Sequence, residues 1–514
     1  MIKNFKKISL PGFLLVCLQV IVSAQSGIIH TKYGKIEGYQ EENIRIFKGI
    51  PFAAPPVGDL RWKAPQTPVA WKGIKKCVNF SASPIQSKPV PFLCWSKEFI
   101  APPTPLSEDC LYLNVWTGAS SASEKRPVFV WIYGGGFISG SAGCDIYDGL
   151  EYAKKGIVFV SINYRVGALG FMAHPELSKE GNGLSGNYGL MDQVAALQWV
   201  KENIAVFGGD PSNVTIGGQS AGSISVYSLI ASPSARGLFK RAIAESGGIF
   251  GSFKMGSLEE GEKTGIALQQ KLHVDNLKAM RSLPADSILS ANSGMNEAGR
   301  FQSDLHFTPV RDGAFLPADF HKAFREGKIN PVDFLGGWVI DEMTMFGTEK
   351  ISKEEFTHRL KEQYGSRAEN LLALLPHADS AEATQSMVEL ERINFGVTSP
   401  YSMSLYNPKP EYLYEFSHVP VKKPGFPDYG AFHTAEVPYA LHNLHQWDRP
   451  WQPVDYDVEN KMSDYWIHFI RSGNPNGPGL PDWQPYRSGV TLEIGDQIEA
   501  KNNLYKQLLE ALVD

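Results

Sequence analysis

The sequence predicts an α/β fold with a large, mixed, mostly parallel β-sheet that is covered by helices on both faces. Short apolar runs, each typical of a strand buried on both sides, occur at residues 128–132, 157–162, 214–216, 241–244, 334–339 and 412–416. Helical segments separate these runs. Buried strands that alternate with helices are typical of a parallel sheet between two helical layers.

The remaining elements follow from local patterns. An apolar stripe at helical spacing predicts a core-facing helix and consists of Leu190, Val194, Leu197, Val200 and Ile204. Residues 28–47 alternate more and carry turn signals, which predicts antiparallel strands at the edge of the sheet. Residues 83–106 and 473–486 are dense in Pro and Gly, and we expect long loops there.

The composition indicates a globular chain with ample material for a core. Of its 514 residues, 43% are hydrophobic and 20% are charged, as in ordinary folded domains. The formal net charge is only −5, and no long basic run occurs beyond the first ten residues. We therefore expect no nucleic-acid partner, because such proteins gather Lys and Arg on one face.

The N-terminus predicts a cleaved signal peptide at residues 1–24 and one domain at residues 25–514. Lys3, Lys6 and Lys7 precede an apolar stretch at 12–22, and a small-residue cleavage site ends at Ala24. The stretch is too short to span a bilayer, so we expect no stable membrane anchor. A lipid anchor on Cys17 is the alternative, which the bulky Val16 disfavours. The expected location is secreted or periplasmic.

Four cysteines would remain after cleavage, namely Cys77, Cys94, Cys110 and Cys144. Export permits disulfides, and four cysteines allow three full pairings. None has the spacing of a metal site. We expect one bridge that staples a loop and involves Cys110.

The sharpest local motif is Gly218-Gln219-Ser220-Ala221-Gly222. A strand is predicted directly before it and a helix directly after it. At such a strand–turn–helix junction, glycines let the backbone pass closely while the serine hydroxyl stands at the carboxyl edge of the sheet. An ordinary glycine-rich turn is the alternative, but the flanking elements favour a nucleophilic serine.

Three glycines, Gly134, Gly135 and Gly136, follow the strand at 128–132. Glycine-rich loops in this place expose backbone amides, as an oxyanion-binding loop requires. The amides of Gly135, Gly136 and Ala221 are the predicted donors. A phosphate-binding loop is the rival interpretation, but the Lys-Ser/Thr that should follow is absent.

A serine nucleophile needs a base, and in folds with this serine turn the acid and then the histidine follow the serine in the chain. The late histidines are His418, His433, His442, His445 and His468. Of these, His433 is favoured because it lies in a loop of small residues after a strand. His468 falls in a predicted helix, and His442 with His445 lacks a third zinc ligand.

Two adjacent carboxylates, Asp341 and Glu342, follow the strand at 334–339. Their side chains point in different directions, so at most one can address the histidine. The pattern alone does not choose between them.

A longer series of segments resembles the type-B carboxylesterase family, which includes cholinesterases and bacterial para-nitrobenzyl esterases. The matching segments span nearly all of the mature chain. Besides the serine turn they are residues 31–38, 47–58, 107–114, 131–137, 163–165, 190–193, 207–211 and 473–476.

The resemblance implies an α/β-hydrolase fold and hydrolysis of a small-molecule carboxylic ester through an acyl-enzyme, without cofactor or metal. It implies Glu342 as the acid and His433 as the base. It also implies two structural ion pairs, Arg61 with Glu108 and Arg165 with Asp192. The substrate pocket that it implies is lined by Gln219, Leu305, Phe307, Met345 and Phe346.

At several positions the sequence differs from the family, and these differences bear on the expected substrate and disulfide. Gln219 stands where cholinesterases have a glutamate, which removes an anion that would favour a cationic substrate. Trp95 does not match the choline-stacking tryptophan, so we do not expect acetylcholine hydrolysis. The family's partner of Cys110 would fall near Pro84, which leaves Cys94 or Cys77 to pair with it. Catalytically dead relatives typically lose a triad member, whereas all three are present here.

Overall fold

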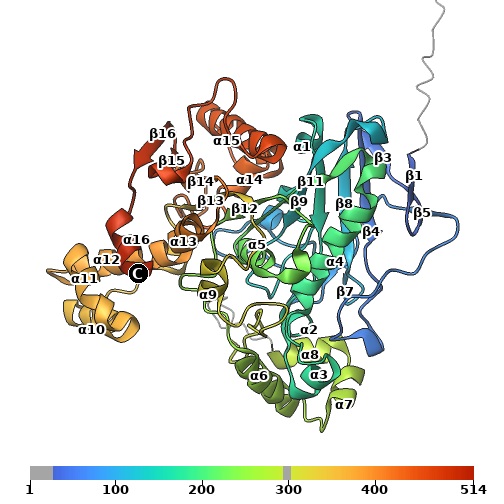
Figure 1. The fold of residues 1–514 in the computed structure, drawn as a ribbon, viewed down its shortest axis with the longest axis horizontal. Coiled ribbons are helices and arrows are strands. Elements are labelled where there is room, and N and C mark those ends of the chain that lie inside the picture. Colours follow the sequence, from blue (N-terminus) through green and yellow to red (C-terminus); the bar gives the residue numbers. More distant parts are fainter. Residues whose placement is uncertain (1–26, 293–302, 514) are drawn as a thin grey trace, which may run out of the picture.

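The computed structural model describes residues 27–292 and 303–513, and at its centre is an eleven-stranded sheet (Figure 1). Neighbouring strands from β15 to β10 run parallel, and the strands at both edges are antiparallel to their neighbours. The predicted mixed, mostly parallel sheet is therefore confirmed. In spatial order the strands are β16 (Ile498–Asn502), β15 (Val490–Ile494), β14 (Glu411–Phe416), β13 (Asp333–Val339), β12 (Arg241–Glu245), β11 (Gly209–Gln219), β9 (Arg126–Ile132), β10 (Val158–Ile162), β8 (Tyr112–Thr117), β4 (Ile44–Pro51) and β3 (Tyr39–Glu41).

The six strands predicted from apolar runs are β9 to β14, and β11 extends well beyond its apolar centre. The antiparallel strands expected at 28–47 are also present. Two of them, β3 and β4, form the sheet edge, whereas β1 (Ile28–Thr31) and β2 (Gly34–Glu37) join β5 (Ile74–Lys76) in a separate small sheet. Two-residue strands β6 (Ser83–Pro84) and β7 (Leu106–Ser107) pair at the base of the predicted long loop.

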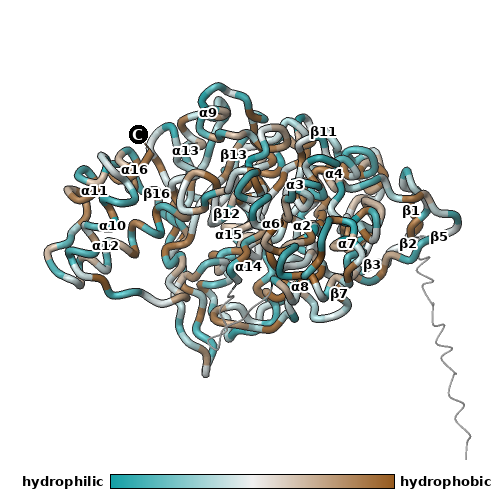
Figure 2. The backbone as a smooth tube through the Cα atoms, turned by 90° about the horizontal axis from the view of Figure 1, so that it is seen from below, coloured by the Kyte–Doolittle hydropathy of each residue, from teal (hydrophilic) through white to brown (hydrophobic). Residues whose placement is uncertain are grey.

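Sixteen α-helices are present in the described residues, together with a π-helical turn, η9 (Ile393–Val397). Their bounds are α1 (Leu150–Lys154), α2 (Gly167–Phe171), α3 (Pro175–Glu180), α4 (Tyr188–Asn203), α5 (Ala221–Ala231), α6 (Leu258–Lys271), α7 (Leu277–Ser282), α8 (Ala285–Asn292), α9 (Phe320–Arg325), α10 (Lys353–Tyr364), α11 (Ala368–Leu374), α12 (Ser380–Arg392), α13 (Thr398–Tyr406), α14 (Val437–Ala440), α15 (Pro453–Ser472) and α16 (Lys506–Val513). Figures 1 and 2 both show α10, α11, α12 and α16 gathered at the end of the molecule opposite β1, β2 and β5.

Helices cover both faces of the sheet because neighbouring side chains of a strand point to opposite faces. Phe129 of β9 stacks on Tyr152 of α1, with ring centroids 5.6 Å apart. The preceding residue, Val128, faces the other way, and it lies with Ile204, which follows α4, against Gly209. The stripe predicted for α4 is buried throughout, which confirms it as core.

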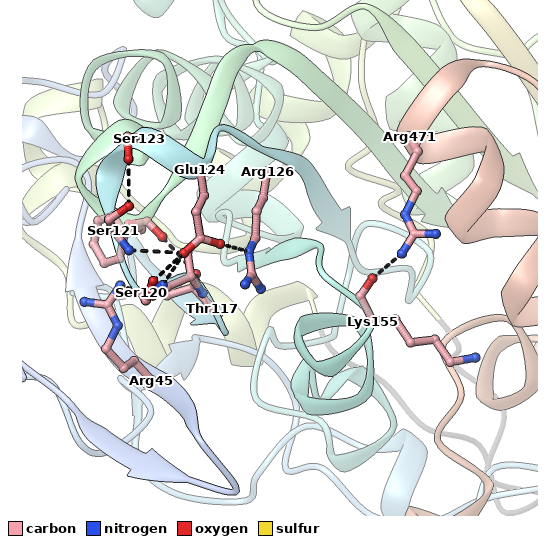
Figure 3. A network of polar contacts seen from close by, with 11 residues as sticks. Arg45, Thr117, Ser120, Ser121, Ser123, Glu124, Arg126, Lys155 and Arg471 are labelled. Atoms are coloured by element: carbon pink, nitrogen blue, oxygen red, sulfur yellow. Dashed lines mark hydrogen bonds and ion pairs between the residues drawn. The ribbon is translucent and has the colours of Figure 1, made fainter.

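A polar network at the amino end of β9 fixes the turn from β8 (Figure 3). The Glu124 carboxylate accepts hydrogen bonds from the amide and hydroxyl of Ser120 and from Nε of Arg126. The hydrogen bonds from Ser120 and Arg126 lower the pKa of Glu124 to about 2. In the same view the Arg471 guanidinium of α15 donates to the carbonyl of Lys155, which follows α1. These contacts lie at the amino ends of β9 and β10, at the end of the sheet opposite the serine turn.

Both predicted ion pairs are present. Arg61 and Glu108 lie 2.6 Å apart, and the Arg61 guanidinium also donates to two backbone carbonyls near α7. Arg165 and Asp192 lie 2.8 Å apart and are almost fully buried. Because a buried charge without its partner is strongly unfavourable, each pair fixes how its two segments meet.

The predicted disulfide is wrong, because the structure has four free, buried thiols: Cys77, Cys94, Cys110 and Cys144. Cys94 lies near Arg449, whereas Cys110 lies near the Arg165–Asp192 pair. A bridge needs Cβ atoms about 3.5–4.5 Å apart, and thiols in separate surroundings do not meet this condition. Burial raises the pKa of Cys94 to about 12, which keeps it a neutral, unreactive thiol.

The predicted signal peptide at residues 1–24 lies outside the described residues, as does Cys17. Within residues 27–292 and 303–513, no helix has both the length and the apolar character needed to cross a membrane.

Candidate active site

Ser220 occupies the turn between β11 and α5. Its backbone has φ of 59° and ψ of −122°, a left-handed conformation that non-glycine residues rarely adopt. The Ser220 amide donates to the Glu245 carbonyl, and the Ser220 carbonyl accepts from the Ile224 amide of the first turn of α5. The sharp turn is therefore fixed on both sides, and the half-buried serine lies at the wall of a cavity.

Glycines are required around this serine because other chain segments pass too close for a side chain. A Cβ atom on Gly222 would lie 2.1 Å from the Ile132 carbonyl oxygen of β9. A Cβ on Gly134 would lie 3.0 Å from the Cβ of Ser220 itself. The glycine spacing of the motif thus follows from the close seating of α5 and of the glycine loop on β9 and β11.

The glycine loop after β9 lies on the wall of the same cavity as Ser220. Gly135 and Gly136 have φ of 109° and 62°, and both are exposed. Among the described residues, no protein acceptor binds the amides of Gly135, Gly136 or Ala221. Ala221 is the first residue of α5, where the helix dipole favours negative charge. All three amides are available to a ligand.

His433 and Glu342 form a buried hydrogen-bonded pair. The distance from His433 Nδ1 to Glu342 Oε2 is 2.6 Å, and the two side chains are 7% and 0% exposed. Glu342 follows β13, and its other oxygen accepts from the Val339 amide at 3.3 Å. With Nδ1 occupied by the carboxylate, Nε2 is left to act on a group in the cavity that His433 shares with Ser220.

The two adjacent carboxylates have different partners. Asp341 Oδ2 accepts from the Ala431 amide at 2.8 Å. That bond holds the loop that carries His433, while Glu342 contacts the imidazole itself. Asp341 is thus bonded to the backbone near His433, and Glu342 to the ring itself.

The surroundings of the pair raise the pKa of His433. Burial acts to lower the pKa of His433, but the charge and hydrogen bond of Glu342, with a smaller contribution from the charge of Glu436, raise it above its usual value. Glu436 is itself buried and accepts a hydrogen bond from the Ser246 hydroxyl at 2.7 Å. Burial and the negative charge of Glu342 raise the pKa of Glu436 to about 7.

Gln219 lies against the imidazole. Its Nε2 is 3.2 Å from His433 Nε2 and 3.4 Å from His433 Nδ1. In the ring plane, a point this close to both nitrogens would collide with the carbon between them, so the amide lies over the ring face. Gln219 is almost fully buried, so an uncharged side chain covers this face of the imidazole.

Phe395 contacts His433 from another side, and no sequence motif points to it. Its ring meets the imidazole edge-on, with centroids 5.3 Å apart and planes 73° apart. Phe395 belongs to η9, a π-helical turn between α12 and α13, and such turns occur often at functional sites. The sequence gives no local signal for this irregularity.

The cavity measures about 630 Å³ and has a mostly apolar lining, as is typical of pockets for drug-sized ligands. The loop at residues 85–101 forms one wall and the glycine loop forms another. Among the described lining residues, Lys88 is the one charged side chain apart from the imidazole. No carboxylate is among the described residues that line the cavity.

Of the predicted pocket residues, Gln219 and Phe346 line the cavity. Leu305, Phe307 and Met345 do not line it, and their prediction is corrected here. They are 7%, 2% and 4% exposed and pack within the hydrophobic core. The apolar walls come instead from the loop at 85–101, from α2 and from α8.

The other late histidines have different surroundings. His418 bridges Asp455 and Asp496, and the Nδ1 of His442 lies 3.0 Å from the Ser463 hydroxyl. His445 is exposed, and His468 is a helical residue beside Gly477. The described residues contain no cluster of three or more side chains suited to hold a metal ion.

Comparisons with known proteins agree over most of the chain. A model described as the carboxylesterase family matches residues 25–511. Fumonisin B1 esterase from Sphingopyxis macrogoltabida is 33% identical over 516 residues, which cover 96% of this chain and 91% of that protein. Para-nitrobenzyl esterase from Bacillus subtilis is 34% identical over 492 residues, which cover 93% and 96%. The solved structure of a thermophilic PNB esterase superposes with a TM-score of 0.80 at 31% identity, over 95% of this chain and all of that one.

Proposed function

Because this chain belongs to the carboxylesterase family and is a carboxylic ester hydrolase, we propose that Ser220, His433 and Glu342 form its catalytic triad. In the first half-reaction His433 Nε2 takes the proton of the Ser220 hydroxyl, and Oγ attacks the ester carbonyl carbon. The resulting tetrahedral intermediate collapses as the C–O bond to the alcohol breaks. The imidazolium gives its proton to the departing alcohol, and the acyl group stays on Ser220.

In the second half-reaction, water takes the place of the alcohol. His433 removes a proton from the water, whose oxygen attacks the acyl carbon, and the bond to Ser220 then breaks with return of the proton to Oγ. Glu342 holds the imidazole tautomer and stabilises the cation that forms twice in each cycle. The amides of Gly135, Gly136 and Ala221 stabilise the oxyanion, and each donor of this kind is typically worth about 3 kcal/mol.

The observation that supports this proposal most directly is the His433–Glu342 hydrogen bond of 2.6 Å, on a histidine that shares its cavity with a strained serine. Strain of this kind costs on the order of 1–3 kcal/mol and persists where the surrounding structure over-determines it, often at active sites. The unpaired amides of the glycine loop give further support, since they lie in the same cavity.

Ser220→Ala tests the proposal. The variant removes only the nucleophilic oxygen, and we expect turnover of a p-nitrophenyl ester to fall on the order of a million-fold. A thermal unfolding midpoint close to that of the wild type would show that the fold is kept. A loss of turnover of less than about tenfold would contradict the assignment of Ser220 as the nucleophile. Labelling of a residue other than Ser220 by an organophosphonate would also contradict it.

The proposed substrate is a neutral small-molecule ester with an apolar acyl or alcohol group. The cavity walls are mostly apolar, and none of their described residues carries a carboxylate that would bind a cationic group. A panel of p-nitrophenyl esters of increasing chain length, with a para-nitrobenzyl ester and a choline ester, tests this class. We expect kcat/KM to rise with chain length and the choline ester to be the poorest substrate.

We also propose that the chain is exported, to the periplasm or the medium, with cleavage after Ala24. The sequence pattern of residues 1–24 supports this, and the family match begins at residue 25. N-terminal sequencing of the mature protein from cell fractions tests it. A protein that keeps its first 24 residues and stays in the cytoplasm would contradict the proposal.

A further inference from the structure

The loop at residues 83–106 turns back on itself beside His433. Its base is closed by the pairing of β6 with β7. Near its tip, Phe92 and Trp95 exchange two backbone hydrogen bonds of 3.1 and 3.0 Å, with Leu93 in the left-handed region at φ of 48°. Phe92, Leu93 and Trp95 all line the cavity. The loop therefore presents a tight turn, residues 92–95, as part of the substrate wall.

One polar contact joins this turn to the loop of the base. The Trp95 indole Nε1 donates to the Thr434 hydroxyl oxygen at 2.7 Å, across 339 positions of the chain. Thr434 directly follows His433, and its hydroxyl donates in turn to the His433 carbonyl. A single hydroxyl thus links the cavity wall to the backbone of the catalytic histidine.

Thr434 is held in an unfavourable conformation. Its φ is 83°, and for a β-branched residue the left-handed region is a genuine outlier. Such a residue persists only where its surroundings over-determine it. Here the indole on one side and the His433 carbonyl on the other fix the hydroxyl, which indicates that the contact helps to hold the bend after His433.

The aromatic packing of Trp95 ties the turn to the acid side of the site as well. The Trp95 ring lies 4.8 Å from Phe92 and 6.4 Å from Phe346, measured between ring centroids. Phe346 follows Glu342 by four residues and lines the cavity. The indole therefore contacts Phe92 in the cavity wall, Phe346 in the segment that follows Glu342, and Thr434 in the loop that carries His433.

We propose that Trp95 and Thr434 are a pair of positioning residues that hold His433 in register with Glu342 and Ser220. The inference rests on the proposed function, since it assigns a supporting role for that triad. When the turn at 92–95 is in place, the indole fixes Thr434 and the imidazole keeps its hydrogen bond to Glu342. When the contact is broken, the bend after His433 relaxes and the imidazole loses alignment. Substrate that packs on this wall stabilises the aligned state.

A double-mutant cycle tests the pair. Trp95→Phe keeps an aromatic ring but loses the N–H, and Thr434→Val keeps β-branching but loses the hydroxyl. We expect each to lower kcat about fivefold to tenfold, as loss of one hydrogen bond does, with a smaller change in KM. Because both variants break the same contact, the double variant should be no slower than the slower single one. Thr434→Ser restores the hydroxyl and should recover most of the activity that Thr434→Val loses.

The pH profile separates positioning from mere packing. Glu342 raises the pKa of His433, so a misaligned imidazole should have a lower pKa, and the acid limb of kcat/KM should move to lower pH in Trp95→Phe. Trp71→Phe is the matched control, because it also removes one indole hydrogen bond, to the Lys35 carbonyl, but does so far from the cavity. We expect its kcat and acid limb to match those of the wild type.

Three results would overturn the inference: losses that multiply in the double variant, Thr434→Ser as slow as Thr434→Val, or an acid limb that stays fixed in Trp95→Phe. Should Thr434→Val fail to fold, Trp95→Phe alone decides through its kcat and pH profile. Ser220→Ala assayed on the same ester distinguishes the two levels of the argument. If Ser220→Ala is inactive and the cycle is purely additive, only the positioning role of Trp95 and Thr434 is refuted. If Ser220→Ala is active, the proposed triad is refuted together with the positioning role.

Discussion

At the scale of single residues, the charge state of the base depends on the groups that touch it. Glu342 lies 2.6 Å from His433 Nδ1, and its charge and hydrogen bond act against burial to raise the pKa of the imidazole. In the proposed mechanism His433 must be neutral to accept the serine proton, so activity should fall as pH drops through this raised pKa. Gln219 covers the ring without adding charge. The pKa of His433, and with it the pH at which activity falls, is therefore lower than it would be with a carboxylate at this position.

Gln219→Glu makes this argument measurable. The new carboxylate would lie within about 4 Å of both ring nitrogens, and an opposite charge at that distance raises the pKa of a histidine by at least about one unit. We therefore expect the acid limb of kcat/KM to move to higher pH, with a larger loss of activity at pH 6 than at pH 8. A pH–rate profile on a neutral p-nitrophenyl ester measures this.

Gln219→Met is the matched control, because it fills similar space without a charge or a hydrogen-bonding group. Its acid limb should stay below that of Gln219→Glu. If the two variants share one profile, the electrostatic argument fails.

At the scale of elements, the serine turn depends on how tightly α5 seats against the carboxyl end of β9. Gly222 has no space for a side chain, since a Cβ would lie 2.1 Å from the Ile132 carbonyl oxygen and 3.0 Å from that of Tyr133. Both atoms belong to backbone and cannot rotate away. The first turn of α5, which carries the Ala221 amide, would have to move.

Gly222→Ala should therefore cost both stability and activity. Forcing atoms into a packed interior typically costs about 1–3 kcal/mol. A displaced Ala221 amide would remove one of the proposed oxyanion donors, worth about a hundredfold in kcat. Urea unfolding and steady-state kinetics measure the two effects. Gly256→Ala is the control, because its Cβ would meet only the Glu260 side chain at 3.4 Å or more. Equal effects of the two substitutions would contradict the seating argument.

Elements with a strong local pattern are predictable from sequence, and elements without one are not. Strands β9 to β14 are apolar on both faces, so a short run marks each one. The outer hairpin of β15 and β16 lacks such a run, because β16 is largely exposed. The disulfide prediction failed for a related reason, since four cysteines give no information on which thiols the fold brings together.

The same limit applies to the site. The glycine spacing around Ser220 is a local requirement and can be found in the sequence. The choice between Asp341 and Glu342 depends on side-chain direction, which only the bond from the Ala431 amide and the bond from His433 reveal. The contact between Trp95 and Thr434 joins two loops 339 residues apart, and no periodicity or motif predicts such a pairing.

At the scale of the whole molecule, the parallel sheet gathers the site at one edge. The glycine loop follows β9, Ser220 follows β11 and Glu342 follows β13, and the carboxyl ends of parallel strands meet at the same edge. His433 comes from the long connection after β14. The fold must therefore hold the segments beyond β14 firmly, and a buried histidine outside the cavity contributes to this.

His418 binds three of those segments together. The histidine itself lies just after β14. Its Nδ1 is 2.6 Å from Asp496, in the turn between β15 and β16, and its Nε2 is 3.0 Å from Asp455 of α15. Asp455 also accepts from the Tyr439 hydroxyl of α14, which continues the loop of His433. Burial acts to lower the pKa of His418, but the hydrogen bonds and charges of both carboxylates raise it above its usual value.

This cluster predicts a pH-dependent contribution to stability. A histidine whose folded pKa is raised stabilises the fold fully below its unfolded pKa of about 6.5, and the contribution is lost as pH rises through the folded value. The pKa of Asp455 is lowered, because the bonds from His418, the Gln452 amide and Tyr439 outweigh burial. Its contribution is lost only as pH falls through that lowered value. The stabilising window thus lies between about pH 4 and pH 6.5.

His418→Gln should lower the free energy of unfolding by about 2–3 kcal/mol at pH 6, as loss of hydrogen bonds to charged groups does. The imidazole loses its charge as pH rises through its raised pKa, so the same substitution should cost less at pH 9 than at pH 6. Urea unfolding of both proteins at both pH values measures the difference. His445→Gln is the control, since that side chain is exposed and lies within hydrogen-bond distance of the neighbouring Gln446. An equal cost of His418→Gln at pH 6 and pH 9 would show that the cluster acts through shape alone, because only a charged imidazole makes the contribution of the two carboxylates depend on pH.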